Sequence, residues 1–99
     1  MVSSNYYTVS IVRKMNNNRY MLYLQNEKQF ADESEAISFA KNVRAKLTLY
    51  NVIQYTNWMI PTEEYTDNLE ELPTNVFSCR YKDENCTYYV IVEKRIYFM

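Results

Sequence analysis

The sequence contains no histidine and no glycine, and these two absences exclude several common kinds of active site. Without histidine there is no Ser-His or Cys-His nucleophile system and no imidazole ligand for a metal. Without glycine there is no phosphate-binding P-loop and no dinucleotide-binding fingerprint. Two cysteines alone cannot complete a four-ligand zinc site. We therefore expect a protein that is not an enzyme and that binds no metal and no cofactor.

Long apolar runs are also missing from the chain. No window approaches the ~18 consecutive apolar residues of a membrane span, and the first residues show no basic region followed by an apolar run. The 99 residues are 47% hydrophobic and 23% charged, which is typical of one globular domain over residues 1–99. We expect this domain in the cytoplasm, away from membranes.

The amino-acid usage indicates an A/T-rich genome. Eleven tyrosines and eleven asparagines, which have A/T-rich codons, accompany no glycine, four alanines and two prolines, which have G/C-rich codons. We interpret this bias as the mark of a phage, a virus or another mobile element, and we expect the protein to act in the cytoplasm of a host cell.

Residues 88–98 give the clearest structural pattern in the chain. An apolar row, interrupted by Lys94, occupies the even positions Tyr88, Val90, Val92, Ile96 and Phe98. A more polar row surrounds Ile91 at the odd positions Tyr89, Glu93, Arg95 and Tyr97. This period of two predicts a strand with one face on the core.

A turn between Lys82 and Asp83 then predicts a hairpin that pairs Cys79 with Cys86 and Phe77 with Tyr88. The two cysteines form either a cross-strand disulfide or, as a reducing cytoplasm favours, two free thiols.

A first hairpin is predicted over residues 6–25. Asn17 and Asn18 tolerate the positive φ angles of a two-residue turn between its arms. The predicted register pairs Met15 with Tyr20, Arg13 with Leu22 and Ile11 with Leu24. This register brings the apolar rows of both arms to one face.

A helix is predicted from about Glu33 to Lys46, with Asp32 as its N-cap. Helical spacing predicts a face toward the sheet made of Ala36, Phe39, Ala40, Val43 and Leu47. Residues 49–58 favour a strand, with a helix continuing to Trp58 as the alternative. Residues 61–73 read as a connector that suits one helical turn. The whole predicts the α+β class: an antiparallel sheet of about five strands, ordered β-β-α-β-β-β, with one helix packed on one face.

Charge is distributed unevenly along this chain of net charge −1. From Leu47 to Cys79 there is no lysine or arginine, and five acidic residues give this stretch a local charge of −5. We call residues 63–71 the acidic segment, and its candidate contact residues are Glu63, Glu64, Tyr65, Asp67, Glu70 and Glu71. Clustered carboxylates steer a protein toward a basic surface and raise the rate of encounter.

We interpret the chain as a small protein-binding inhibitor encoded by a phage or virus. Its acidic segment is expected to dock on a basic, nucleic-acid-binding surface of a host protein such as a defence nuclease. Tyr65 and Trp58 are the nearest aromatic anchors, although Trp58 suits ordinary packing better. A solvated loop that only improves solubility is the alternative for the acidic segment.

A different class of function uses the outer face of the sheet. Aromatic side chains between basic ones stack unpaired bases, which predicts single-stranded nucleic-acid binding through Arg19, Tyr23, Tyr89, Arg95 and Tyr97. The slightly negative net charge argues against this function. The same face, with Ile91 between Tyr89 and Tyr97, also suits a homodimer interface.

Overall fold

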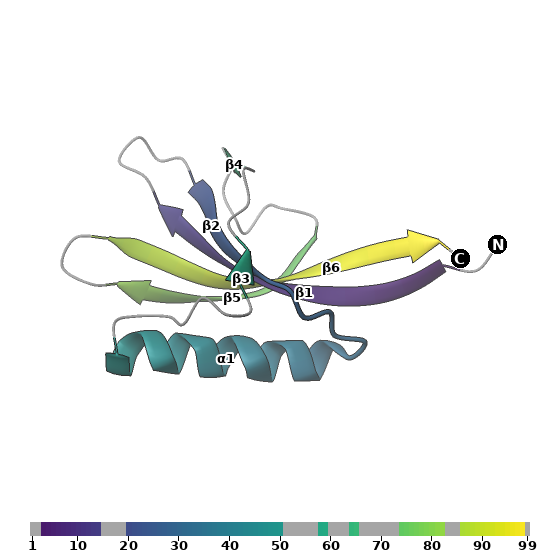
Figure 1. The fold of residues 1–99 in the computed structure, drawn as a ribbon, viewed down its shortest axis with the longest axis horizontal. Helices are drawn as coiled ribbons and strands as arrows, with labels where there is room; N and C mark the ends of the chain where they lie inside the picture. Colours follow the sequence, from purple (N-terminus) through teal and green to yellow (C-terminus); the bar gives the residue numbers. More distant parts are fainter. Residues whose placement is uncertain are drawn as a thin grey trace.

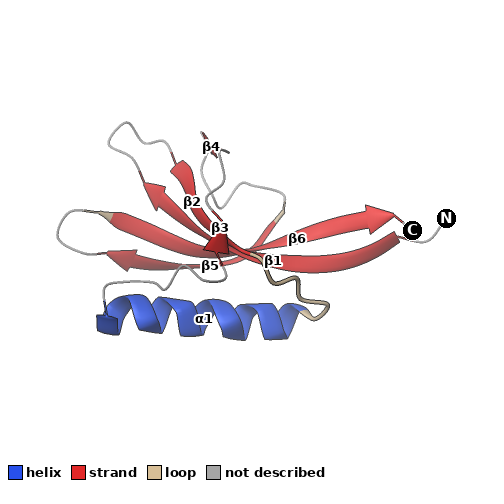
Figure 2. Ribbon diagram, viewed as in Figure 1, coloured by secondary structure: helices blue, strands red, loops and turns tan. Residues whose placement is uncertain are grey.

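The computed structural model describes residues 3–14, 20–50, 58–59, 64–65, 74–82 and 86–98. Within these residues, four long antiparallel strands form a sheet with one helix beneath it (Figures 1 and 2). The bounds are β1 Ser3–Lys14, β2 Tyr20–Asn26, α1 Glu33–Tyr50, β5 Asn75–Lys82 and β6 Thr87–Phe98. Two-residue strands, β3 (Trp58–Met59) and β4 (Glu64–Tyr65), both pair with β2. The α+β prediction is confirmed, with four long strands in place of about five.

The first and last strands form the centre of the sheet. β1 and β6 pair continuously from Ser3 opposite Phe98 to Lys14 opposite Thr87. β2 flanks β1 and β5 flanks β6, so the order is β3-β2-β1-β6-β5, with β4 also on β2. β5 therefore lies at one edge of the sheet, and β3 and β4 lie at the other.

The main core lies between α1 and the face of the sheet that it covers. Its buried residues alternate along the strands and recur at helical spacing along α1: Tyr7, Val9, Ile11, Leu24, Phe30, Ala36, Ala40, Val43, Leu47, Val90 and Val92. The predicted inner face of the helix is confirmed, with Phe39 half-buried against this cluster.

The opposite face of β1 and β6 is buried as well, at the centre of the sheet. Thr8 and Ser10 on β1, and Ile91 and Glu93 on β6, are all 5% exposed or less. Cross-strand partners share a face, and Thr8 pairs with Glu93 as Ser10 pairs with Ile91. The prediction that the odd positions of β6 form an outward row is therefore wrong at Ile91 and Glu93. Alternation shows which face is more apolar, but not whether the other face is covered.

The register of the first hairpin changes partway along β1. Ile11 pairs with Leu24 as predicted, but a β-bulge then shifts the pairing. Val12 pairs with Leu22, Arg13 with Met21 and Lys14 with Tyr20, so the predicted pairs Arg13–Leu22 and Met15–Tyr20 are wrong. The prediction counted only one apolar row on β1, whereas Val12, on the other face, is fully buried too. The Asn17-Asn18 turn lies outside the described residues.

The closing hairpin turns later than predicted. Phe77 pairs with Val92, Cys79 with Val90 and Tyr81 with Tyr88. The predicted pairs Cys79–Cys86 and Phe77–Tyr88 are wrong, and both cysteines are free thiols. The observed register is shifted by an even number of residues, so the inward face of β5 stays the same. It also stacks the rings of Tyr81 and Tyr88, whose centroids lie 6.4 Å apart.

Helix α1 begins where the sequence predicts and ends later. The backbone N–H of Ser34 donates to Asp32 Oδ1 at 3.1 Å, which confirms Asp32 as the N-cap. The helix continues to Tyr50, so the predicted strand is wrong over residues 49–50. Buried Leu47 extends the apolar stripe of the helix, and this packing outweighs the strand propensity of Thr48 and Tyr50. Residues 51–57 lie outside the described part of the chain.

Beyond the N-terminal end of α1, β1 and β6 continue as a two-stranded ribbon (Figure 1). Ile96 was predicted to extend the core row of β6, but it is 57% exposed. The helix does not reach this part of the sheet, and so it provides no partner for the side chain of Ile96.

Candidate functional site

Two residues of the acidic segment pair with the outer edge of β2. Glu64 and Tyr65 form β4, in which Glu64 pairs with Met21 and Tyr65 with Tyr20. The other predicted contact residues, Glu63, Asp67, Glu70 and Glu71, lie outside the described residues. Trp58 in β3 is half-buried against the main core, as expected for a packing residue.

The residues predicted to stack nucleic-acid bases do not form one continuous exposed row. Tyr89 and Arg95 are half-buried, and buried Ile91 and Glu93 separate them along β6. Tyr97 pairs with Ser4 near the far end of the two-stranded ribbon. Tyr23 lies at the β-bulge, where the pairing between β1 and β2 passes from Leu24 to Leu22. Arg19 lies outside the described residues. The homodimer hypothesis rested on an exposed Ile91, and this premise is wrong because Ile91 is fully buried.

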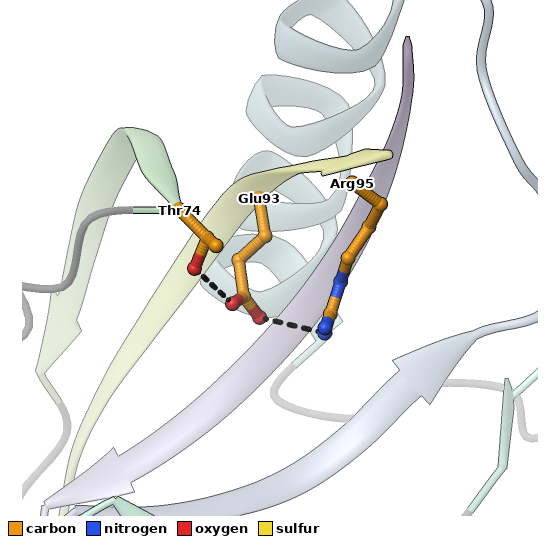
Figure 3. A network of polar contacts seen from close by, with 3 residues as sticks. All are labelled: Thr74, Glu93 and Arg95. Carbon is orange, nitrogen blue, oxygen red and sulfur yellow. Dashed lines mark hydrogen bonds and ion pairs between the residues drawn. The ribbon is translucent and has the colours of Figure 1, made fainter. Parts of the chain in front are cut away.

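A polar network lies on the second buried face, beside the start of β5 (Figure 3). The hydroxyl of Thr74 donates to Glu93 Oε2 at 2.8 Å, and Arg95 Nη2 lies 3.4 Å from Glu93 Oε1. Glu93 is 2% exposed, so these donors replace much of the hydration that its carboxylate loses. The hydroxyls of Thr8 and Ser10 are buried on the same face and make no hydrogen bond to the described part of the chain. In the sequence, Glu93 has the pattern of one polar residue in an outward row of residues 89–97, and nothing there indicates its burial.

Four cationic side chains flank β5, which is an edge strand in the described part of the sheet. We call this group the basic surface, and its exposed members are Lys41, Arg44, Arg80 and Lys82. Lys41 Nζ lies 5.8 Å from the centre of the Phe77 ring, and Arg44 Nε donates to the Arg80 carbonyl at 3.1 Å. These cations are far apart in the sequence, which carries no signal that α1 and β5 are neighbours.

Cys79 lies between the basic surface and the core. Burial raises the pKa of the Cys79 thiol above its ordinary value, and the positive charges of Arg44 and Lys41 offset part of that rise. The thiol also points to the carbonyl of Val90, with sulfur and oxygen 3.8 Å apart. A raised pKa favours the neutral thiol, which is the unreactive form, so Cys79 lacks the character of a nucleophile.

In the described ranges, no three His, Cys, Asp or Glu side chains gather as a metal site requires. A shallow cavity of about 430 Å³ lies beside the first half of α1, lined by Lys28, Phe30, Ser34, Glu35, Ser38, Phe39 and Asn42. Its lining includes two serines, a lysine and a glutamate, but no histidine or cysteine of the kind that forms a Ser-His or Cys-His nucleophile system. None of the described helices has the length and apolarity needed to cross a membrane.

Comparison of the chain with protein-family models, with curated proteins and with solved structures gave no match. The functional argument therefore depends on the distribution of charge over the sheet.

Proposed function

We propose that this protein is a non-enzymatic, protein-binding inhibitor that docks its acidic segment on a basic surface of a host protein. The target surface is one that normally binds the phosphate backbone of a nucleic acid, as in a defence nuclease. The composition supports a phage, viral or other mobile-element origin. The proposed site of action is the cytoplasm of the host cell.

One observation carries this proposal, namely the run of five acidic residues without a lysine or arginine between Leu47 and Cys79. β4 pairs Glu64 and Tyr65 of the acidic segment with the outer edge of β2, whereas the basic surface lies at β5, the opposite edge strand among the described residues. Arg13, which pairs with Met21, is a cation on the next strand but one from β4. A local excess of carboxylates over cations produces a field that steers association with a positive partner.

The single-stranded nucleic-acid alternative has less support. Its aromatic residues are interrupted by buried Ile91 and Glu93, and Arg95 already forms an ion pair with Glu93. Stacking platforms for bases need neighbouring exposed rings, and Tyr89 is half-buried.

The test compares two immobilised baits, the native protein and a variant in which the five acidic residues of the segment are replaced by Gln or Asn. We expect a host protein to be retained by the native bait and lost by the variant, with unchanged melting temperature. Bound target should elute as salt rises and should be displaced by an oligonucleotide, because nucleic acid and inhibitor compete for the same cations.

A matched pair of triple variants controls for net charge. Glu63, Glu70 and Glu71 are changed to Gln in one variant, and the exposed residues Glu27, Glu33 and Glu35 are changed to Gln in the other. Each variant loses three negative charges, so the two have the same net charge. Only the variant of the acidic segment should retain less of the target. Equal retention by the two variants, or retention by the fivefold variant, contradicts the proposal.

A further inference from the structure

The ribbon of β1 and β6 has an open edge along the last residues of β6. β5 pairs with β6 only as far as Asn75 opposite Glu93. The backbone N–H of Lys94 then donates to the Thr74 carbonyl at 2.7 Å. β6 continues to Phe98, and among the described strands none lies beside this continuation on the side of β5. The end of β6 therefore extends past its neighbour on that side (Figure 1).

One hydrogen bond shows which backbone groups face the open edge. The Lys94 N–H points to the side of β5, because it bonds to Thr74. In antiparallel strands, the backbone N–H and C=O of every second residue point to the same side. Ile96 and Phe98 follow Lys94 at that spacing, and β6 pairs with β1 over this stretch without a bulge. The N–H and C=O groups of Ile96 and Phe98 therefore point away from β1, toward the open edge.

The residues at this edge offer little protection against the addition of a strand. Natural edge strands are protected by charged side chains, by proline or by a bulge. Residues 96–98 are Ile-Tyr-Phe, with no charge and no proline, and their ladder with β1 is regular. The side chain of Ile96 is also 57% exposed, although isoleucine suits a strand position that is at least half-buried. The open edge therefore favours pairing with a further strand.

We propose that two copies of this chain pair through the open edge of β6 and form a two-fold symmetric dimer. The two-fold axis passes between the two Tyr97 residues, and Ile96 of each copy lies opposite Phe98 of the other. Ile96 and Phe98 then exchange hydrogen bonds through their outward N–H and C=O groups. Apolar positions lie opposite apolar ones on one face of the joined sheet. This contact does not involve the acidic segment, so the inference is independent of the proposed function.

The surroundings of Lys94 select this register over its neighbours. A two-fold axis beside Ile96 requires Lys94 to form a hydrogen-bonded pair with Phe98 of the other copy, but the Lys94 N–H is already bound within its own chain. An axis beside Lys94 places two lysines directly opposite each other, and like charges in such a pair are destabilising. With the axis beside Tyr97, none of the cations of β6 lies opposite another cation.

Sedimentation velocity of the purified native chain tests the proposal. We expect the sedimentation coefficient to rise with protein concentration and to level off at the dimer value, because a two-fold contact is closed. The rise should persist at high salt, since backbone bonds and apolar side chains form the contact. A chain that stays monomeric at every concentration overturns the proposal, whichever other strand the edge then accepts. Assembly that continues past the dimer also overturns it.

A matched pair of proline variants identifies the edge. Ile96→Pro removes the outward N–H at the β6 edge, and Asn5→Pro removes the outward N–H of its cross-strand partner at the β1 edge. Asn5 faces outward because Tyr7, two residues later, bonds outside the ribbon to the backbone of Phe30. We expect the Ile96→Pro chain to be monomeric and the Asn5→Pro chain to form the dimer. Equal association of the two variants overturns the proposal.

A second pair of variants repeats this comparison without a change to the backbone. Ile96→Lys and Asn5→Lys both alter exposed side chains, so both proteins should fold, as circular dichroism will show. The Ile96→Lys chain should lose the dimer, because a charge then lies in the apolar contact. The Asn5→Lys chain should keep it. A dimer that survives Ile96→Lys contradicts the proposal even where the proline variants fail to fold.

Oxidative cross-linking tests the register itself. In a Cys79→Ala, Cys86→Ser background, Tyr97→Cys places the thiols of the two copies opposite each other at a non-hydrogen-bonded pair. The Cα atoms of such a pair lie about 4.5 Å apart, within the range that a disulfide spans. Ser4→Cys, at the position opposite Tyr97 on β1, is the control. Non-reducing electrophoresis should show a covalent dimer for Tyr97→Cys only, and equal yields for the two variants overturn the proposal.

Discussion

Thr74 donates a hydrogen bond from its hydroxyl to Glu93, with 2.8 Å between the two oxygens. The backbone N–H of Lys94 donates to the Thr74 carbonyl at 2.7 Å, so two bonds join the residue before β5 to β6. Glu93 is almost fully buried, and a buried carboxylate needs such donors in place of water. The pair therefore fixes the start of β5 against the central strands.

We expect Thr74→Val to lower the free energy of unfolding by about 1–2 kcal/mol, because a buried carboxylate loses a donor while the side-chain volume is kept. Urea denaturation followed by circular dichroism measures the change. Thr8→Val is the matched control, since Thr8 lies opposite Glu93 and its buried hydroxyl has no partner in the described part of the chain. The control should be neutral or stabilising, and equal losses in the two variants would refute this account.

Ile91 tests whether the second face of the sheet is covered, and Ile96, in the helix-side row of the same strand, is the exposed control. Both lie on β6, but Ile91 is 0% exposed and Ile96 is 57% exposed. We expect Ile91→Ala to cost about 2–5 kcal/mol of unfolding free energy, as truncation in a core does. Ile96→Ala should change it by less than about 0.5 kcal/mol. A small loss at Ile91, in the same denaturation assay, would mean that this face is open to water.

The inward residues of the fold were predictable from the sequence because periodicity reports local geometry. The period of two along residues 88–92 and the helical spacing of Ala36, Ala40, Val43 and Leu47 both identify buried side chains correctly. Asp32 was recognised as a cap because capping depends on residues two or three positions apart. These features need no knowledge of distant parts of the chain.

Register and neighbouring elements could not be predicted, because they depend on contacts between distant residues. Two registers that differ by an even shift bury the same face, so the pattern could not separate Cys79–Cys86 from the observed Cys79–Val90 pairing. Nothing local shows that β1 pairs with β6. The proximity of Lys41 and Arg44 to β5, on which the basic surface depends, follows only from the packing of the helix.

Asp32→Ala should lower the free energy of unfolding by about 0.5–2 kcal/mol, because the Ser34 N–H loses its acceptor at the first turn of α1. Asp32→Asn keeps an acceptor oxygen and should recover most of that loss. Thermal and urea unfolding of the three proteins measure the difference. If the Asn and Ala variants were equally unstable, the capping bond would not be the source of the effect.

Stability should also fall in alkaline solution through the thiol of Cys79. Burial raises the pKa of this thiol above its ordinary value of 9.0, more than the nearby positive charges of Arg44 and Lys41 lower it. The folded state therefore keeps the thiol proton to a higher pH than the unfolded state does. The stabilisation is complete below the unfolded pKa and is lost as the pH rises through the folded pKa. In a Cys86→Ser background, stability above pH 9.0 should decline more steeply with Cys79 present than after Cys79→Ala.

Alkylation kinetics give a second measurement of the same thiol. The thiolate is the reactive form, so Cys79 in the Cys86→Ser protein should react with iodoacetamide more slowly when folded than when unfolded in denaturant at about pH 8.5. Lys41→Gln should slow the folded reaction further, because one of the charges that favour the thiolate is removed. Lys46→Gln is the matched control, since Lys46 is an exposed helical lysine that does not contribute to this pKa. Equal rates in the two lysine variants would show that the field at Cys79 does not come from Lys41.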